Sequence, residues 1–370
     1  MLCDKKEICG SCSWSEIPYE QQLKDKLNNI NLTAQKEKIP FKCENILFAS
    51  ETNHYRNKMD FVINYKGEFG LHEKGKWWKV IDNHTCFLPD NKIIDLYHKL
   101  YPWVKNCGLS YYDRKANMGI LRYAIIRATT LGDTMVIILT SAPTDDVEAS
   151  RIKEIILSLT KTINVTSLIW SYTKSKSDIS FGDINEVLYG KPYINEDING
   201  YKFIIRPNSF FQTNSNAAKI LQSTVLDLIK KCNLPRESKV LDLYCGSGFF
   251  TLPLANIFKN TFGVESVQDA VSDALDNAKA NNMVVDFRCD LAEKIYISDY
   301  SPDFILVDPP RAGLHKKVIE DLMSNSPEYL LYVSCKHEKF FEEMKILQRV
   351  FMLFNASNII FFFKITLASS

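Results

Sequence analysis

A strand–helix–strand unit near the end of the chain limits the folds that this sequence can adopt. The apolar runs 304–307 and 329–333 predict two buried strands, and the segment 314–323 between them has the length of a helix. Two apolar strands joined by a helix form a parallel unit, and ligands of such open sheets bind at the carboxyl ends of the strands. Asp308 and Cys335 follow the two strands, so we expect an acid and a thiol at one edge. A lone cysteine in this position is also compatible with a small buried apolar side chain.

A glycine-rich turn marks a second point on the same predicted sheet. The strand 240–243 runs into the sequence D-L-Y-C-G-S-G at 242–248, and a helix is expected at 249–258. Glycines let the backbone pass close to a ligand, and the start of a helix offers free N–H groups. Glu265 ends the next strand, where a carboxylate can accept hydrogen bonds from both hydroxyls of a ribose. Because strands and helices keep alternating, this part is predicted to be α/β, a doubly wound sheet.

The turn discriminates between two classes of nucleotide-binding enzyme. A dinucleotide-binding fold favours G-x-G-x-x-G, whereas this turn reads C-G-S-G-F-F. The carboxylate of Asp242, just before the glycines, would attract a cation such as the amino group of S-adenosylmethionine and would repel a pyrophosphate. The residues alone therefore favour a methyltransferase over an NAD enzyme.

Three cysteines lie close together near the start of the chain, in the spacing C-x5-C-x2-C: Cys3, Cys9 and Cys12. Such crowding in a polar segment favours metal ligation over core packing. A fourth ligand has to come from elsewhere, and Cys43 and Cys86 are the nearby candidates. An iron–sulfur cluster and a structural zinc ion are both compatible with this spacing.

Residues 52–80 combine basic and aromatic side chains in a segment that alternates like antiparallel strands. The segment carries six Lys or Arg against three Asp or Glu, with six aromatic residues between them. Lysines that contact phosphates and aromatic rings that stack on unpaired bases are typical of single-stranded RNA binding. A half-buried sheet with a solvated lysine face explains the pattern equally well.

The length of 370 residues predicts about two domains. Predicted strands and helices between 90 and 172 indicate an α+β region, and turn residues at 190–200 suggest a boundary. We therefore divide the chain into an N-terminal and central region, 1–200, which carries the cysteine cluster, and a Rossmann-like domain, 201–370. The net charge of +1 gives no sign of a polyanionic partner, so nucleic-acid binding would need a local basic cluster.

No stretch of the sequence predicts export or membrane insertion. The first twelve residues are polar, and the longest apolar runs, such as 359–363, are too short to span a bilayer. Ten cysteines in such a chain favour metal ligation or catalysis over disulfides. We expect a soluble, cytoplasmic protein without a membrane partner.

Several motifs taken together resemble those of the RNA 5-methyluridine methyltransferases that use S-adenosylmethionine. They span residues 1 to about 345 and comprise the N-terminal cysteines with Cys86, N-S-F-F-Q-T-N at 208–214, D-L-Y-C-G-S-G at 242–248, D-P-P-R-A-G at 308–313 and Y-V-S-C at 332–335. The joint match is highly specific, although each motif alone is not.

The resemblance implies a Rossmann-like methyltransferase domain with S-adenosylmethionine as methyl donor. It also implies a [4Fe–4S] cluster on Cys3, Cys9, Cys12 and Cys86. The cofactor contacts that it implies come from Gln212, Tyr244, Glu265 and Asp308, and the nucleophile is Cys335. The implied partner is RNA, either tRNA or 23S rRNA, with the T-loop uridine of tRNA favoured. We expect a monomer.

The chemistry of this family explains why a cysteine is needed. Carbon 5 of uracil is a poor nucleophile, and addition of a thiolate to carbon 6 converts the ring into an enolate whose carbon 5 can attack a methyl group. The target base has to leave its stack to reach such a pocket. In this context Cys335 is predicted to be the nucleophile rather than a buried apolar residue. The basic and aromatic segment 52–80 makes a small molecule or a protein a less suitable substrate.

The C-terminal part of the sequence departs from the family pattern. The family removes the proton from carbon 5 with a glutamate that follows a Phe-Pro and a His. No Asp or Glu follows Glu343 here, and Glu342 and Glu343 lie on the helix after Cys335, at unsuitable positions. Unless another group serves as the base, we predict slow release of the product. The alternative function is an RNA-binding protein of the same scaffold with impaired turnover.

Overall fold

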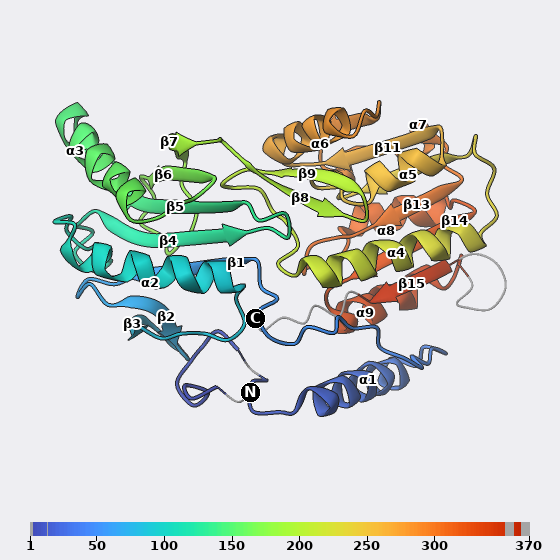
Figure 1. The fold of residues 1–370 in the computed structure, drawn as a ribbon. Helices are drawn as coiled ribbons and strands as arrows, with labels where there is room; N and C mark the ends of the chain where they lie inside the picture. The colour runs from blue at the N-terminus through green and yellow to red at the C-terminus, as the bar shows by residue number, and fades with distance from the viewer. Residues whose placement is uncertain (1–2, 13, 352–358, 364–370) are drawn as a thin grey trace.

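The computed structural model describes residues 3–12, 14–351 and 359–363. These residues form two lobes, each built around one large β-sheet, with a small hairpin between them (Figure 1). The helices are α1 (Tyr19–Lys36), α2 (Asn91–Asn106), α3 (Asp146–Leu157), α4 (Ser215–Lys231), α5 (Thr251–Ile257), α6 (Gln268–Ala280), α7 (Ile297–Tyr300), α8 (Lys316–Ser324) and α9 (His337–Leu347).

The strands of the first lobe are β1 (Lys58–Ile63), β2 (Phe69–Glu73), β3 (Lys76–Asp82), β4 (Leu121–Ala128), β5 (Thr134–Ser141), β6 (Ser167–Thr173) and β7 (Ile184–Gly190). The hairpin consists of β8 (Ile194–Ile198) and β9 (Tyr201–Ile205). The strands of the second lobe are β10 (Lys239–Leu243), β11 (Asn260–Glu265), β12 (Asp286–Cys289), β13 (Phe304–Val307), β14 (Tyr329–Ser334) and β15 (Ile359–Phe363).

The first sheet has the strand order β3-β2-β1-β4-β5-β6-β7. Strands β1, β2 and β3 are antiparallel neighbours, as the alternating sequence predicted, and β5 pairs in parallel with β6 across the helical connection α3. Helices α2 and α3 cover one face of this sheet. The other face packs against the β8–β9 hairpin and the second lobe, so β4 and β5 are buried on both faces, and β5 is mostly a continuous apolar run in the sequence.

The second sheet has the strand order β12-β11-β10-β13-β14-β15, and every neighbouring pair is parallel. This is the doubly wound order that the sequence predicted. Alternate residues of each strand face opposite sides: Val240 packs toward α4, α5 and α6, and Leu241 packs toward α1, α8 and α9. The sheet is therefore covered on both faces, and its carboxyl edge remains as the place for a ligand.

Helix α1 packs against the second sheet although it lies early in the chain. Ile30 and Ala34 belong to the same core as α8 and α9, and the carboxylate of Glu37 pairs with Lys345. The helix extends to Lys36, and its buried face continues to Ala34. The division at residue 200 remains a prediction, and side-chain packing crosses it.

The turn residues expected at a domain boundary lie instead within a hairpin. Asn199 and Gly200 have φ angles of 54° and 87°, as the short turn between β8 and β9 requires. None of the helices in the described part of the chain combines the length and the apolar character that crossing a bilayer requires.

Candidate active site and cysteine cluster

The strand order of the second sheet reverses between β10 and β13, and the carboxyl ends of β10, β13 and β14 lie side by side. We call this the carboxyl edge. Asp308 follows β13, and Cys335 follows β14. The structure therefore places the acid and the thiol on the same edge, at the position where open sheets bind ligands.

Cys335 lies at the junction of a buried strand and a helix. Val333 and Ser334 are buried, whereas Cys335 is partly exposed. Helix α9 starts two residues later, with Lys336 as its N-cap. Peptide dipoles at the start of a helix stabilise an anion. The sulfur is thus accessible from the edge rather than buried among apolar side chains.

The glycine turn after β10 leaves room for a ligand. Tyr244, Gly246 and Gly248 have φ angles of 65°, 55° and 84°, so the backbone turns sharply through the left-handed region. A Cβ atom added to Gly246 would meet nothing within 4 Å. The backbone N–H of Gly246 donates to Glu265 Oε2 at 3.1 Å, and that of Val267 donates to Oε1 at 2.9 Å. These bonds hold the Glu265 carboxylate beside the turn.

Asp242 is one of three acidic side chains at the carboxyl edge, and it is the buried one. Its carboxyl group is fully buried, and this burial raises its pKa to about 8, with Asp308 and Glu265 adding to the effect. Thr251 Oγ1 donates to Oδ2 at 2.6 Å, and Oδ1 has no hydrogen-bond partner among the described residues. Three acids thus converge at one point, and a ligand that carries positive charge and N–H donors, as S-adenosylmethionine does, fits these surroundings.

Gln212 is buried where the two lobes meet. It precedes α4, and its backbone carbonyl accepts a hydrogen bond from Asn57 Nδ2 at 2.9 Å. The same Asn57 amide donates to Ser215 Oγ at 2.9 Å. Asn214 is the N-cap of α4, and its side-chain oxygen accepts a hydrogen bond from the backbone N–H of Ala217. The segment that carries Gln212 is thereby fixed against the first lobe.

The loop after Asp308 is held by a buried glutamate on α9. Glu343 Oε1 accepts from the backbone N–H of Leu314 at 3.0 Å, and Oε2 accepts from the Tyr332 hydroxyl at 2.7 Å. A Cβ atom on Gly313, whose φ is 84°, would collide with Glu343 Oε1, so only glycine fits there. Burial raises the pKa of Glu343. Both carboxylate oxygens are engaged inside the protein, which agrees with its unsuitability as the base.

Sequence reasoning missed this role of Glu343, although a signal was present. Phe340, Glu343, Met344 and Leu347 follow the helical spacing of one buried face, and all four are buried. An acidic residue on an otherwise apolar helix face indicates a buried carboxylate that needs partners.

The N-terminal cysteines gather beside β2 and the loop after β3. Cys9 pairs with Glu73 of β2, and Gly10 N donates to His72 O at 3.0 Å. Cys9 and Cys86 are buried in one core, and Cys12 packs against it. Burial, followed by the charges of Cys9, Cys3 and Cys12, raises the pKa of Cys86 to about 11. The structure thus places Cys9, Cys12 and Cys86 at one core, with Cys3 near enough to affect the pKa of Cys86. The described residues whose ligand atoms all lie within 4.8 Å of one another do not include this set of four cysteines.

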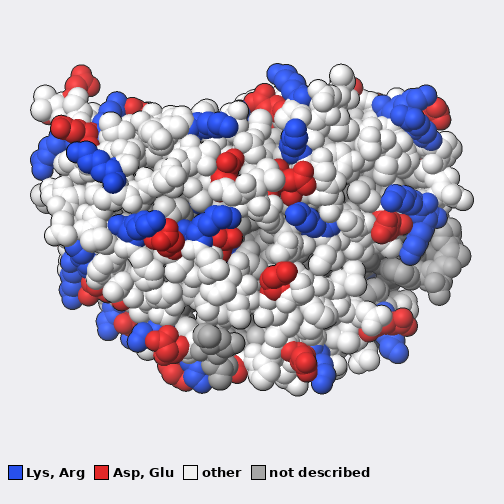
Figure 2. Space-filling view, viewed as in Figure 1, with Lys and Arg blue, Asp and Glu red and all other residues white. Residues whose placement is uncertain are grey.

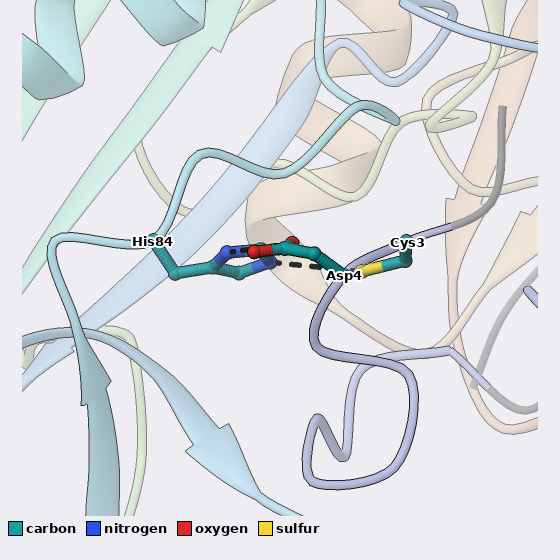
Figure 3. A group of neighbouring side chains, drawn as sticks. All are labelled: Cys3, Asp4 and His84. Atoms are coloured by element: carbon teal, nitrogen blue, oxygen red, sulfur yellow. Dashed lines mark hydrogen bonds and ion pairs between the residues drawn. The ribbon is translucent and has the colours of Figure 1, made fainter.

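His84 is a neighbour of this cluster that the sequence analysis did not select. Its Nε2 lies 3.8 Å from Cys3 Sγ, and its Nδ1 lies 3.9 Å from Asp4 Oδ1 (Figure 3). The ligand atoms of these three residues lie within 4.8 Å of one another. Cys43, the other candidate for a fourth ligand, bonds through its N–H to Asn31 Oδ1 and packs against the second sheet. The position of Cys43 therefore favours Cys86 as the fourth ligand.

Comparisons with known proteins identify the family of this chain. A family model described as tRNA (Uracil-5-)-methyltransferase matches residues 18–289 and 284–362. A tRNA (uracil(54)-C(5))-methyltransferase of Pyrococcus abyssi is 30% identical over 339 residues, which cover 92% of this chain and 77% of the relative. The enzyme of that name from Pyrococcus furiosus is 33% identical over 341 residues, which cover 90% of this chain and 75% of the relative.

The solved structures include one with the same architecture throughout. The crystal structure of Pyrococcus abyssi tRNA (uracil-54, C5)-methyltransferase in complex with S-adenosyl-L-homocysteine matches with a TM-score of 0.78 and 29% identity, over 92% of this chain and 78% of that chain. The family resemblance and the doubly wound fold class that the motifs predicted are both confirmed: the chain belongs to the tRNA (uracil-5-)-methyltransferase family.

Proposed function

We propose that this protein transfers the methyl group of S-adenosylmethionine to carbon 5 of a uridine in RNA, and in tRNA rather than 23S rRNA. The observation that carries the proposal is the carboxyl edge, where the partly exposed thiol of Cys335 stands on the same rim as Asp308 and the glycine turn. The names of the two Pyrococcus relatives support the T-loop uridine as the target.

The role of Cys335 follows from the electron demand of the uracil ring. Its thiolate adds to carbon 6, and the electron pair of the 5,6 double bond moves into the ring as an enolate. Carbon 5 then forms a bond to the methyl group while the bond from that methyl group to the sulfonium sulfur breaks and S-adenosylhomocysteine leaves. Carbon 5 still carries its hydrogen at this stage. A base takes that proton, the double bond re-forms, and the thiolate leaves carbon 6.

The methyl donor supplies a methyl group on a positively charged sulfur, with an ammonium group and a ribose at its two ends. We assign its binding to Gln212, Tyr244, Glu265 and Asp308. The acidic side chains of Asp308 and Glu265 would attract the positive charge. Glu265, held at the glycine turn, is suited to accept hydrogen bonds from the ribose hydroxyls.

We also propose that Cys3, Cys9, Cys12 and Cys86 hold a [4Fe–4S] cluster. Three of these cysteines, Cys9, Cys12 and Cys86, belong to or pack against one core, and Cys3 affects the pKa of Cys86, which supports an all-sulfur donor set. Bound there, the cluster would tie the N-terminal segment to the first sheet. Its removal should expose the buried Cys9 and Cys86.

The second candidate function is an RNA-binding protein of the same scaffold with impaired turnover. The sequence feature that favours it is the lack of an acid after Glu343. For either function we expect a monomer in the cytoplasm, with an RNA-binding region at 1–200 and a methyltransferase domain at 201–370.

The test is to map methylated uridines on unmodified tRNA and 23S rRNA after incubation with the protein and the methyl donor. We expect 5-methyluridine at one T-loop position of tRNA. Cys335→Ala should abolish methylation and leave binding of the methyl donor intact, whereas Cys107→Ala, at a partly buried cysteine of the first lobe, should leave both unchanged. Methylation by Cys335→Ala would contradict the proposed nucleophile, and methylation of neither RNA would contradict the proposed activity.

A further inference from the structure

A half-open hollow lies beside β3, which forms an edge of the first sheet. It has a volume of about 180 Å³ and is lined by Val62, Ile63, Asn64, Tyr65, Trp77, Trp78, Tyr112, Asp113, Arg114 and Lys115. All of these residues belong to the first lobe, so the hollow is separate from the carboxyl edge that carries Cys335. Pockets that bury a whole drug-sized ligand start at roughly 300 Å³. The hollow therefore suits one planar ring of a larger molecule.

Three large aromatic side chains stand half exposed around this hollow. Tyr65, Trp77 and Trp78 have exposed fractions of 50%, 47% and 46%. The rings of Trp77 and Trp78 lie 5.7 Å apart at an interplanar angle of 83°, which makes two walls of a corner. Aromatic rings left in contact with water gain free energy when a flat partner covers them. Their placement around one hollow indicates a ring-shaped ligand.

Arg114 fixes one wall before any ligand arrives. Its guanidinium lies 5.4 Å from the centre of the Trp77 ring, and its Nη2 donates to Tyr123 Oη at 2.9 Å. Asp178, from the loop after β6, pairs with Arg114 and also accepts from the Tyr123 hydroxyl. A wall that is already ordered loses little entropy on binding.

The rim of the hollow carries charges of both signs. Asp113 accepts the backbone N–H of Lys115, and Glu68 accepts from the Asn64 amide, so both acids are engaged locally. Lys66 lies with its ammonium 5.7 Å from the Tyr65 ring centre, and Lys115 lines the hollow. On the face shown in Figure 2, charges of both signs are interspersed without a large patch of one sign. The ammonium groups that could contact phosphates at this hollow are those of Lys66 and Lys115.

We propose that this hollow holds one unpaired nucleobase of the RNA substrate, at a nucleotide other than the uridine that is methylated. The base stacks on Trp77 or Trp78, and the neighbouring phosphates lie near Lys66 and Lys115. Stacking on aromatic rings combined with lysine–phosphate contacts is how proteins hold unpaired nucleotides. The proposal rests on RNA being the substrate.

The test uses Trp77→Ala, Trp78→Ala and the double variant. Two readouts are followed: methylation kinetics on unmodified tRNA, and quenching of tryptophan fluorescence by a short single-stranded oligoribonucleotide and by an RNA duplex. Loss of one stacked base should raise KM roughly 5- to 150-fold with a much smaller change in kcat. The single strand should quench the wild type, the duplex should quench it much less, and the double variant should lose this quenching.

Two further variants separate stacking from folding. Trp77→Phe keeps a ring and should retain most of the affinity. Tyr189→Ala removes a ring that is 48% exposed on β7, at the opposite edge of the same sheet, and should leave KM unchanged. The melting temperature of each variant shows whether a loss of RNA affinity is caused by unfolding. If the alanine variants unfold, Trp77→Phe and Trp78→Phe are used instead to test whether the hollow binds a base.

Each outcome decides for or against the hollow. An unchanged KM together with unchanged quenching in the double variant would overturn the proposal. The exposed aromatic rings would then indicate a surface that binds a protein partner instead. If the wild type methylates no RNA, the proposed function fails, and the fluorescence of the double variant still decides whether the hollow binds a base.

Discussion

The hydroxyl of Tyr332 donates a hydrogen bond to Glu343 Oε2 at 2.7 Å, within the core of the second lobe. Tyr332 lies on β14, three residues before Cys335, and Glu343 lies on the helix that follows it. Because the other carboxylate oxygen binds the N–H of Leu314, this one side chain joins the strand of the nucleophile to the loop that follows Asp308.

Replacing Glu343 with alanine should therefore destabilise the protein. The Tyr332 hydroxyl and the Leu314 N–H would remain buried without a partner, and each such donor costs about 1–3 kcal/mol. Glu342→Ala removes the exposed neighbour on the same helix and should change the free energy of unfolding by less than about 0.5 kcal/mol. Urea denaturation of both variants measures the difference, and equal stability would contradict the role of Glu343 as a brace.

The variant Glu343→Gln separates a brace from a base. The amide keeps the size of the side chain and can still accept one hydrogen bond. We expect a small loss of stability and methylation close to that of the wild type once folding is accounted for. A different result would assign proton removal to Glu343. In that case Glu343→Gln would be as stable as the wild type and would transfer the methyl group, but it would not release the product.

The buried carboxyl of Asp242 should make stability depend on pH. Burial raises its pKa from 3.8 to about 8, so the folded state binds a proton that the unfolded state releases. The stability that this proton contributes is fully present below about pH 4 and is lost as the pH rises through about 8. Asp242→Asn removes the titration and keeps an acceptor for Thr251. Between pH 4 and 8 the free energy of unfolding of Asp242→Asn should fall less than that of the wild type. If the two proteins lose stability equally over this range, the pKa of Asp242 is not raised.

Product release should be slow in this protein. No acid follows Glu343 in the sequence, and Glu343 itself is engaged by Leu314 and Tyr332. RNA should therefore accumulate on Cys335 as an adduct that survives denaturation and appears as a shifted band on a denaturing gel. The adduct should be absent from Cys335→Ala. Rapid multiple turnover with no such band would show that another group removes the proton.

The cysteine cluster predicts a difference between two substitutions. Cys86→Ser should remove iron, sulfide and visible absorbance from protein purified without oxygen, because the cluster would lose a ligand. Cys43→Ser should leave them in place, since Cys43 packs against the other sheet. Stoichiometric zinc without sulfide in the wild type would replace the iron–sulfur assignment with a structural zinc site.

Local patterns in the sequence were sufficient for the elements that carry the candidate site. β13 has the bounds predicted from the apolar run 304–307, and β10 and β14 match the predicted strands 240–243 and 329–333 to within one residue at each end. Apolar runs mark buried parallel strands because helices cover both faces of the sheet. In a doubly wound sheet a strand, its crossover helix and the next strand form a parallel unit, which places Asp308 and Cys335 at one edge.

Tertiary structure decided which distant residues meet. The choice of Cys86 over Cys43, the contact of His84 with Cys3 and the packing of α1 on the second sheet depend on where long connections place their ends. The hollow at Trp77 and Trp78 likewise combines three separate segments. Sequence periodicity reports which face of an element is apolar, but not which partner covers it, because many apolar faces are equally good partners until the whole chain is packed.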